Sequence, residues 1–172
     1  VFSCFIAFLL LFLLFPQKKS FEIDFLDVGQ GDGIYLCTGG GTSMFIDGGS
    51  TDVKQVGKYR ILPFLKAKGV SEISYWFVSH TDTDHVSGLK EVLVSGYRVE
   101  YLVFAKAVEK EAKTKELAEL ARSHGTKVLY MQAGDTVRSK RAAMRCLYPK
   151  ASDKAEDVND LCLVLQFEEG DI

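Results

Sequence analysis

The sequence predicts a mixed α/β fold in which helices pack on a β-sheet with both antiparallel and parallel strands. Two patterns support this prediction: hairpin-like strand pairs come first in the chain, and strand-like and helix-like segments alternate after them. The chain has 172 residues, of which 47% are hydrophobic and 26% are charged. This balance suits one domain with a buried core and excludes a disordered or collagen-like chain.

Three short strands are expected first. Phe21, Ile23 and Phe25 alternate with acidic residues, which indicates a half-buried strand with the apolar side chains inside. Residues 33–37 and 43–47 follow as two further strands, and the glycine-rich segment 38–42 joins them as a hairpin turn.

Helices and strands alternate in the remainder of the chain. The clearest helix covers 110–124, because Leu117, Leu120 and Ala121 recur at helical spacing and Gly125 ends it. We expect two other helices at 61–68 and 88–95. The expected strands cover 73–79, 101–104, 127–131, 136–138, 144–148 and 161–167.

The first fifteen residues carry no charge and are nearly all apolar. A membrane-spanning helix needs ~20 such residues, so we interpret residues 1–19 as the end of a transmembrane segment with a polar exit at Gln17, Lys18 and Lys19. A cleaved signal peptide is the alternative. Because the chain also stops directly after a strand-like segment, we expect a fragment at both ends, with an incomplete domain over 20–172.

The net charge of −2 gives no hint of a nucleic-acid or membrane-surface partner, but basic residues gather locally. One basic run lies within 52–68 and another within 138–150. Such runs are usually solvated faces, and the alternative is a surface that follows a phosphate backbone. The four cysteines match no zinc spacing and are interpreted as small buried thiols.

The strongest chemical signal is the segment 79–85, Ser-His-Thr-Asp-Thr-Asp-His, directly after an apolar strand. It contains four potential metal ligands within six residues, namely His80, Asp82, Asp84 and His85. We expect a loop here, because a loop can turn alternate side chains toward one point. The alternative is a solvated polar turn that caps a helix. The third histidine, His124, ends a predicted helix and is interpreted as structural.

The pattern His80-x-Asp82-x-Asp84-His85 resembles the metal motif of the metallo-β-lactamase superfamily, which usually has His in place of Asp82. The segments 25–32 (Phe-Leu-Asp-Val-Gly-Gln-Gly-Asp) and 45–49 (Phe-Ile-Asp-Gly-Gly) accompany it. These two segments and the Asp at position 82 make residues 20–172 similar to the C-terminal domain of ComEC-type DNA-uptake membrane proteins. The segment 158–165 also resembles that family, with Cys162 where Ser is usual.

The resemblance implies a metallo-β-lactamase αββα sandwich, truncated at its C-terminus and preceded by part of a transmembrane helix. It implies that His80 and Asp82 bind a first metal ion and that Asp84 and His85 bind a second, with the family's remaining ligands beyond Ile172. Two nitrogens and two oxygens form a harder donor set than three histidines, which favours Mn²⁺ or Mg²⁺ beside Zn²⁺.

Supporting roles for other residues also follow from the resemblance. Asp47 would support the metal loop and fix the orientation of a ligand without binding the metal itself. The alternative is that Asp47 only caps a turn. The turn 27–33 would line the site with Gln30 and Asp32, and its alternative is a glycine-permitted loop without a further role.

The function that the resemblance implies is a metal-dependent hydrolase domain that cuts phosphodiesters of incoming DNA, with Asp84 as the catalytic candidate. A separate membrane-anchored hydrolase of a small substrate and a non-catalytic DNA-guiding domain are the alternatives. DNA, the membrane and other competence proteins are the expected partners, on the outer face of the bacterial cell membrane. We expect residues 20–172 alone to bind metal weakly and to leave DNA intact.

Overall fold

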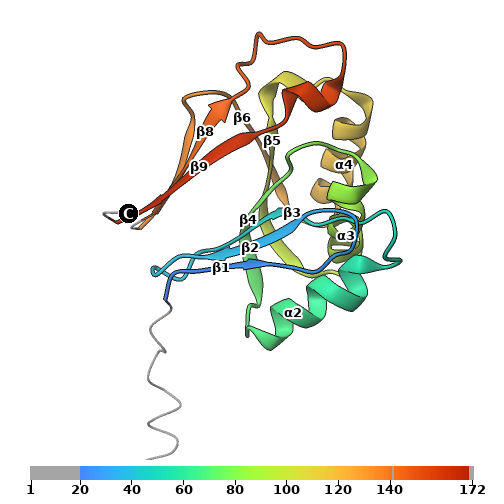
Figure 1. The fold of residues 1–172 in the computed structure, drawn as a ribbon, viewed down its shortest axis with the longest axis vertical. Coiled ribbons are helices and arrows are strands. Elements are labelled where there is room, and N and C mark those ends of the chain that lie inside the picture. Colours follow the sequence, from blue (N-terminus) through green and yellow to red (C-terminus); the bar gives the residue numbers. More distant parts are fainter. Residues whose placement is uncertain (1–19, 141, 171–172) are drawn as a thin grey trace, which may run out of the picture.

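The computed structural model describes residues 20–140 and 142–170, which form two β-sheets and a layer of helices (Figure 1). The first sheet has six strands in the order β1-β2-β3-β4-β5-β6. They are β1 (Glu22–Phe25), β2 (Gly33–Cys37), β3 (Ser43–Asp47), β4 (Glu72–Phe77), β5 (Arg98–Ala105) and β6 (Lys127–Met131). Strands β1 to β3 pair antiparallel and β3 to β6 run parallel, so the predicted mixed sheet is confirmed.

The second sheet is smaller and antiparallel, in the order β7-β8-β9. Its strands are β7 (Thr136–Ser139), β8 (Ala142–Tyr148) and β9 (Val164–Glu169). The helices are α2 (Leu62–Ala67), α3 (Thr83–Val94) and α4 (Ala112–Ser123), with the short helical turns η1 (Gly57–Ile61), η2 (Lys106–Val108) and η3 (Val158–Leu161).

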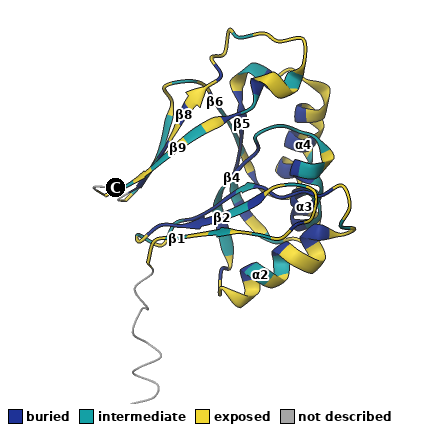
Figure 2. Cartoon of the chain, viewed as in Figure 1, coloured by how far each residue is buried: buried dark blue, intermediate teal, exposed yellow. Residues whose placement is uncertain are grey.

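Two apolar cores place these layers relative to one another (Figure 2). Trp76 of β4 packs in one core with Leu89 of α3 and Leu117 of α4, so the helices cover one face of the large sheet. Phe77, the next residue of β4, packs in the other core with Met144 of β8, so the small sheet covers the opposite face. The order helices, sheet, sheet matches the first three layers of the truncated αββα sandwich that the family resemblance implies.

The burial predicted for β1 is wrong. Ile23 is 43% exposed and Phe25 is 78% exposed, whereas the alternating acidic residues of this strand are half-buried. The reason is that β1 is the edge strand of the large sheet, and its apolar face extends beyond the cover of the small sheet. Just before β1, the ring of Phe21 stacks on the ring of Phe167 in β9, with the two ring centroids 5.4 Å apart.

The structure also corrects the location of the metal motif. Helix α3 begins at Thr83 and not near residue 88, so Asp84 and His85 lie in its first turn and only the residues before them form a loop. Asp82 is the N-cap and has an extended backbone, with φ −76° and ψ 159°. Asp84 in the first turn suits the positive end of the helix dipole. The sequence therefore contained a signal for a helix that begins at Thr83, which the prediction of a loop over 79–85 did not use.

Two smaller differences concern the end of the chain. Strand β9 begins at Val164, because Asp157 accepts a hydrogen bond from the backbone of Asn159 and starts the turn η3 instead. Cys37 and Cys146 are buried as expected, whereas Cys162 follows η3 and is half-buried. The apolar residues 1–19 lie outside the described part of the chain. In the described part, no helix combines the length and apolarity needed to cross a bilayer.

Candidate metal centre

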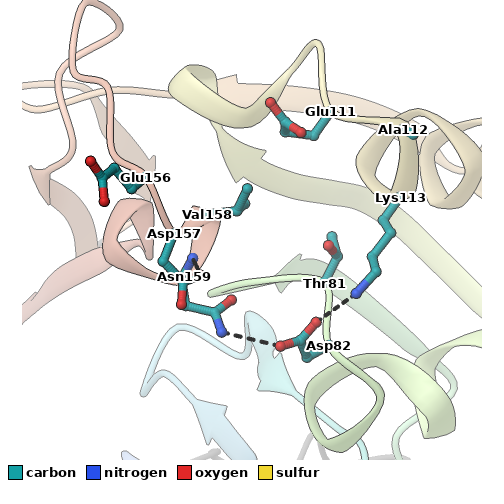
Figure 3. A pocket seen from close by; sticks show the side chains of 9 residues that line it. All are labelled: Thr81, Asp82, Glu111, Ala112, Lys113, Glu156, Asp157, Val158 and Asn159. Atoms are coloured by element: carbon teal, nitrogen blue, oxygen red, sulfur yellow. Dashed lines mark hydrogen bonds and ion pairs between the residues drawn. The ribbon is translucent and has the colours of Figure 1, made fainter.

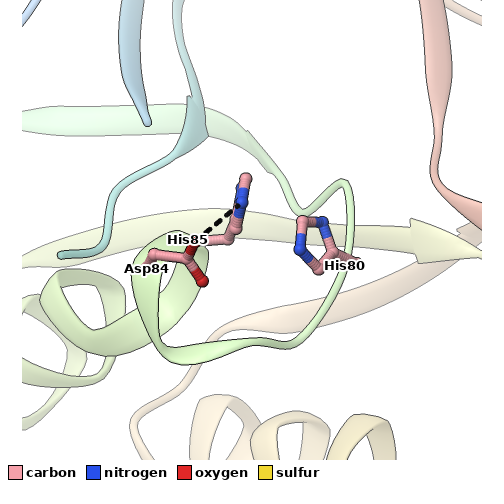
Figure 4. A group of neighbouring side chains, drawn as sticks. All are labelled: His80, Asp84 and His85. Atoms are coloured by element: carbon pink, nitrogen blue, oxygen red, sulfur yellow. Dashed lines mark ion pairs between the residues drawn. The ribbon is translucent and has the colours of Figure 1, made fainter. Parts of the chain in front are cut away.

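The His/Asp motif lies where the end of β4 meets the first turn of α3 (Figure 4). His80, Asp84 and His85 each have a potential ligand atom, and these atoms lie within 4.8 Å of one another. The imidazole centroids of His80 and His85 are 3.7 Å apart, and Nε2 of His85 is 3.7 Å from the Asp84 carboxylate. The structure therefore brings together three of the four predicted ligands.

Asp47 and Ser79 control the orientation of both histidines. Asp47 ends β3 in the left-handed region, at φ 58°, and its side chain is buried. Its carboxylate accepts hydrogen bonds from the Ser79 backbone N–H at 2.8 Å, from Ser79 Oγ at 2.7 Å and from His85 Nδ1 at 2.9 Å. Because the Ser79 hydroxyl proton points to Asp47, its oxygen is free to accept from His80 Nδ1, which lies 3.1 Å away.

This network sets the tautomers. Both histidines carry the proton on Nδ1, so the lone pair of each Nε2 is free for a metal ion. Burial, and then the neighbouring His85, lower the pKa of His80. Burial also acts to lower the pKa of His85, but the hydrogen bond and charge of Asp47 outweigh it and the pKa is raised. A metal ion at His85 must therefore displace a proton at low pH.

The site also passes a chemical test for a metal ion. Donors that share one ion at ~2.0–2.2 Å must lie roughly 3–4.5 Å apart, and the spacing within the cluster is of that order. Asp32, Asp47 and His85 also lie within this spacing, but Asp47 and Nδ1 of His85 are already joined by a hydrogen bond. Two imidazoles with several carboxylates suit Zn²⁺ and Mn²⁺. The residues present therefore fit divalent metal binding.

The turn 27–33 packs against this centre through its backbone. The Asp32 N–H donates to the carbonyl of Asp84 at 3.2 Å, and the Gly49 N–H donates to the carbonyl of Asp32 at 3.1 Å. The Asp32 carboxylate is 3.7 Å from His85 Nδ1 and its side chain is 62% exposed. Gln30 is exposed, and its backbone bonds to Asp52 and Thr51 of the next loop. Asp32 thus lies beside the cluster, whereas the contacts of Gln30 are to the next loop.

Asp82 lies apart from the cluster. One carboxylate oxygen accepts from Lys113 Nζ at 2.8 Å and the other accepts from the side-chain amide of Asn159 at 3.1 Å (Figure 3). The hydrogen bonds from Lys113 and Asn159 lower the pKa of Asp82. These three residues line a cavity of about 580 Å³ beside the motif.

The two basic runs, 52–68 and 138–150, lie in different parts of the fold. Arg60 pairs with Asp27 at 3.3 Å, at the start of the turn that borders the site. Lys140 belongs to the opposite end of the sheet, where it approaches Gly40 in the hairpin that joins β2 and β3. Arg60 of the first run therefore lies beside the turn 27–33, whereas Lys140 of the second run lies beside the hairpin at the other end of β3. His124 ends α4 and its Nδ1 contacts the carbonyl of Leu120, which fits a structural role.

Sequence reasoning did not identify Lys113 or Asn159 as site residues. Lys113 is one of several charged residues in a helix, and its contact with Asp82 spans 31 residues. Asn159 is 77 residues from Asp82. No local pattern distinguishes Lys113, whereas Asn159 lies in the segment 158–165 that carries part of the family resemblance. Ser79 had a usable signal, because it immediately precedes the motif at the end of a strand.

No family model matches the chain. Among curated proteins, the chain is similar to ComE operon protein 3 of Bacillus subtilis (strain 168), with 29% identity over 180 residues. The aligned region covers 97% of this chain and 23% of that protein. The chain is 32% identical over 92 residues to Recombination protein 2 of Haemophilus influenzae, which covers 52% of this chain and 12% of that protein. The chain thus spans less than a quarter of the length of either relative. The similarity to ComEC-type proteins that the motifs predict is confirmed.

Solved structures show the fold. The metallo-β-lactamase fold protein YhfI of Bacillus subtilis has a TM-score of 0.55 at 15% identity, covering 83% of this chain and 52% of that one. CmlA of Streptomyces venezuelae, a diiron β-hydroxylase, has a TM-score of 0.53 at 15% identity, covering 90% and 29%. A metallo-β-lactamase mutant of Cronobacter sakazakii has a TM-score of 0.53 at 15% identity, covering 73% and 50%. The predicted metallo-β-lactamase fold is confirmed.

Proposed function

We propose that this chain is the metal-dependent hydrolase domain of a membrane DNA-uptake protein and that it cuts phosphodiester bonds of incoming DNA. The observation that carries the proposal is the cluster of His80, Asp84 and His85, in a chain that is similar to ComE operon protein 3 over 97% of its length. The metallo-β-lactamase fold places this cluster at the carboxyl end of a parallel strand, where ligands of α/β sheets commonly bind.

The roles of the residues follow from their contacts. His80, Asp84 and His85 would hold one divalent ion, Zn²⁺ or Mn²⁺, and the exposed carboxylate of Asp32 borders this cluster. Bound divalent ions supply the charge that polarises a phosphate group and lowers the pKa of a water molecule. Asp47 and Ser79 would keep both imidazoles in the binding tautomer. Asp84 is the catalytic candidate, because its carboxylate faces the cluster from the first turn of α3.

The expected partners fit this arrangement. Lys54, Lys58 and Arg60 are exposed on the segment that follows β3, and would attract a phosphate backbone toward the site. Residues 1–15 would anchor the domain in the cell membrane, and we place the domain on the outer face, where incoming DNA and other competence proteins are met. The apolar composition of that run supports the anchor.

The proposal is tested on the full product of the gene that encodes this chain. With added Mn²⁺ or Zn²⁺ it should cleave labelled single- or double-stranded DNA, and a chelator should stop the reaction. Asp84→Ala should abolish cleavage, because it removes a carboxylate from the metal cluster. Glu119→Ala, which removes an exposed carboxylate of α4, is the control and should leave cleavage unchanged. If the metal-loaded protein leaves both forms of DNA intact, the DNA-guiding role replaces the nuclease.

A hydrolase of a small substrate is the second candidate, and the cavity beside the motif favours it. The cavity holds about 580 Å³, which suits a small molecule, and its lining includes Glu111, Glu156 and Asp157. These acidic residues repel a free polyanion. Competition decides between the two candidates: excess unlabelled DNA should inhibit hydrolysis of bis(p-nitrophenyl) phosphate by a nuclease, and should not inhibit a small-substrate enzyme.

A further inference from the structure

We propose that Lys113 and Asn159 form a phosphate-binding site, which the Asp82 carboxylate occupies in this structure and leaves when metal ions bind at the neighbouring cluster. The inference rests on the proposed function, because it requires a metal ion at His80, Asp84 and His85. It adds a substrate contact that the motif itself does not contain.

The geometry of the contact is that of an anion site. Lys113 and Asn159 approach Asp82 from two different elements, α4 and η3, and each donates to a different carboxylate oxygen (Figure 3). The two non-bridging oxygens of a phosphodiester present the same pair of acceptors, so the Asp82 carboxylate is a stand-in for them. Lys113 is also the second residue of the 12-residue helix α4, where the helix dipole favours an anion.

Asp82 is the natural residue to move. It lies two positions from both His80 and Asp84 in the metal motif. Its side chain is 38% exposed and that of Lys113 is 69% exposed, so their ion pair contributes little free energy. A divalent ion attracts a carboxylate more strongly than one ammonium group and one amide do. Metal binding can therefore draw Asp82 away and free both donors.

The surrounding charges explain why the site requires metal. Glu111, Glu156 and Asp157 line the same cavity and oppose the entry of a free anion. Divalent ions next to the cavity reverse this balance. A phosphate that contacts the ions on one side would then meet Lys113 and Asn159 on the other. The site would therefore bind phosphate only in the metal-loaded protein. In the metal-free protein, Asp82 and the acidic lining would exclude other anions.

Two measurements on the full gene product test the inference. Free Mn²⁺ is followed by electron paramagnetic resonance during a titration, and binding of dimethyl phosphate is followed by the broadening of its ³¹P resonance by bound Mn²⁺. Lys113→Ala should bind Mn²⁺ about two- to fivefold more tightly, because Asp82 no longer leaves an ion pair. The same variant should bind dimethyl phosphate about tenfold more weakly. Asn159→Ala should change both values in the same directions.

Lys115→Ala is the matched control, because Lys115 is exposed on the same helix and does not line the cavity. If dimethyl phosphate binds Lys113→Ala and Lys115→Ala equally well, the phosphate site is refuted. If Lys113→Ala weakens Mn²⁺ binding, Asp82 is a fixed tether of the metal loop and the exchange is refuted. If the unmodified protein binds neither Mn²⁺ nor Zn²⁺, the proposed function fails together with this inference. If it binds metal and only the phosphate result fails, the proposed function stands and this inference alone is refuted.

The same ³¹P measurement with inorganic phosphate identifies the source of the ligand. Tighter binding of the diester indicates a nucleic-acid backbone, and tighter binding of inorganic phosphate indicates a small phosphate ester. Either result supports the site, provided that it depends on Lys113 and on Mn²⁺.

Discussion

Replacing Gly49 with alanine should separate the two segments that build the metal centre. Gly49 follows β3, and a Cβ atom there would lie 2.5 Å from the amide nitrogen of His85 and closer still to the carbonyl oxygen of Thr83. Ordinary Cβ contacts begin at 3.4 Å, so the loop and the first turn of α3 must move apart by about 1 Å. All three nearest atoms belong to the backbone, which cannot rotate away as a side chain can.

The expected cost is at the upper end of the range for overpacking, about 3 kcal/mol. For a chain of this length that corresponds to a fall of about 6–12 °C in Tm. Urea unfolding of the 172-residue chain measures the free energy directly, with the fluorescence of Trp76 as the probe. Trp76 is the single tryptophan of the sequence, and its indole N–H donates to the carbonyl of Asp47, two residues before Gly49.

Gly40→Ala provides the control. Its Cβ would lie 3.4 Å from Cβ of Lys140 and further from its other neighbours, and the glycine has no positive φ. This variant should change the free energy of unfolding by less than about 0.5 kcal/mol. Equal stability of the Gly49 and Gly40 variants would refute the close approach of the loop to α3, and with it the packing that places Asp84 and His85.

Three further predictions concern the site, the surface and pH. Asp47→Asn should cost about 2 kcal/mol in urea unfolding, because an amide cannot accept all three hydrogen bonds of the buried carboxylate. Asp52→Asn is the control and should cost clearly less, because Asp52 is exposed and its amide oxygen can still accept the hydrogen bond from the Gln30 N–H. Similar losses in the two variants would contradict the network around Asp47. Changing Lys54, Lys58 and Arg60 together to Ala should lower the slope of log K for DNA binding against log salt concentration by about 2 to 3. The control, which changes Lys66, Arg138 and Lys140 together to Ala, should leave this slope unchanged. Equal slopes for the two triple variants would show that Lys54, Lys58 and Arg60 form an ordinary solvated face. Burial, and then the charge of Glu72, raise the pKa of Tyr97 to about 12. The neutral hydroxyl therefore stabilises the folded chain fully below the ordinary tyrosine pKa near 10. This stabilisation is lost as the pH rises toward 12. Tyr97→Phe should therefore be less stable than the unmodified chain at pH 7, because the hydrogen bond to Val70 is lost, and this difference should shrink between pH 10 and 12; a constant difference would show that Tyr97 titrates normally.

Local patterns in the sequence were sufficient for most of the secondary structure. The strands 33–37, 43–47 and 127–131 were predicted with the bounds observed, because short β-branched and aromatic segments between glycine-rich turns have few alternatives. The His/Asp cluster was equally accessible from the sequence, since His80, Asp84 and His85 are close neighbours in the chain. The start of α3 was missed, because Thr83, Asp84 and His85 of the His/Asp motif also make an acceptable first helical turn.

Contacts between distant segments could be decided only by the tertiary structure. Ile23 and Phe25 alternate as core residues do, yet they are exposed because the small sheet does not extend over β1. Gly49 is required because α3 passes within van der Waals contact of the β3 loop. Asp82 has the spacing of a metal ligand, but Lys113 and Asn159 reach it from two other elements. Sequence spacing determines which side chains one segment offers, and the packing of several segments determines which partner each side chain meets.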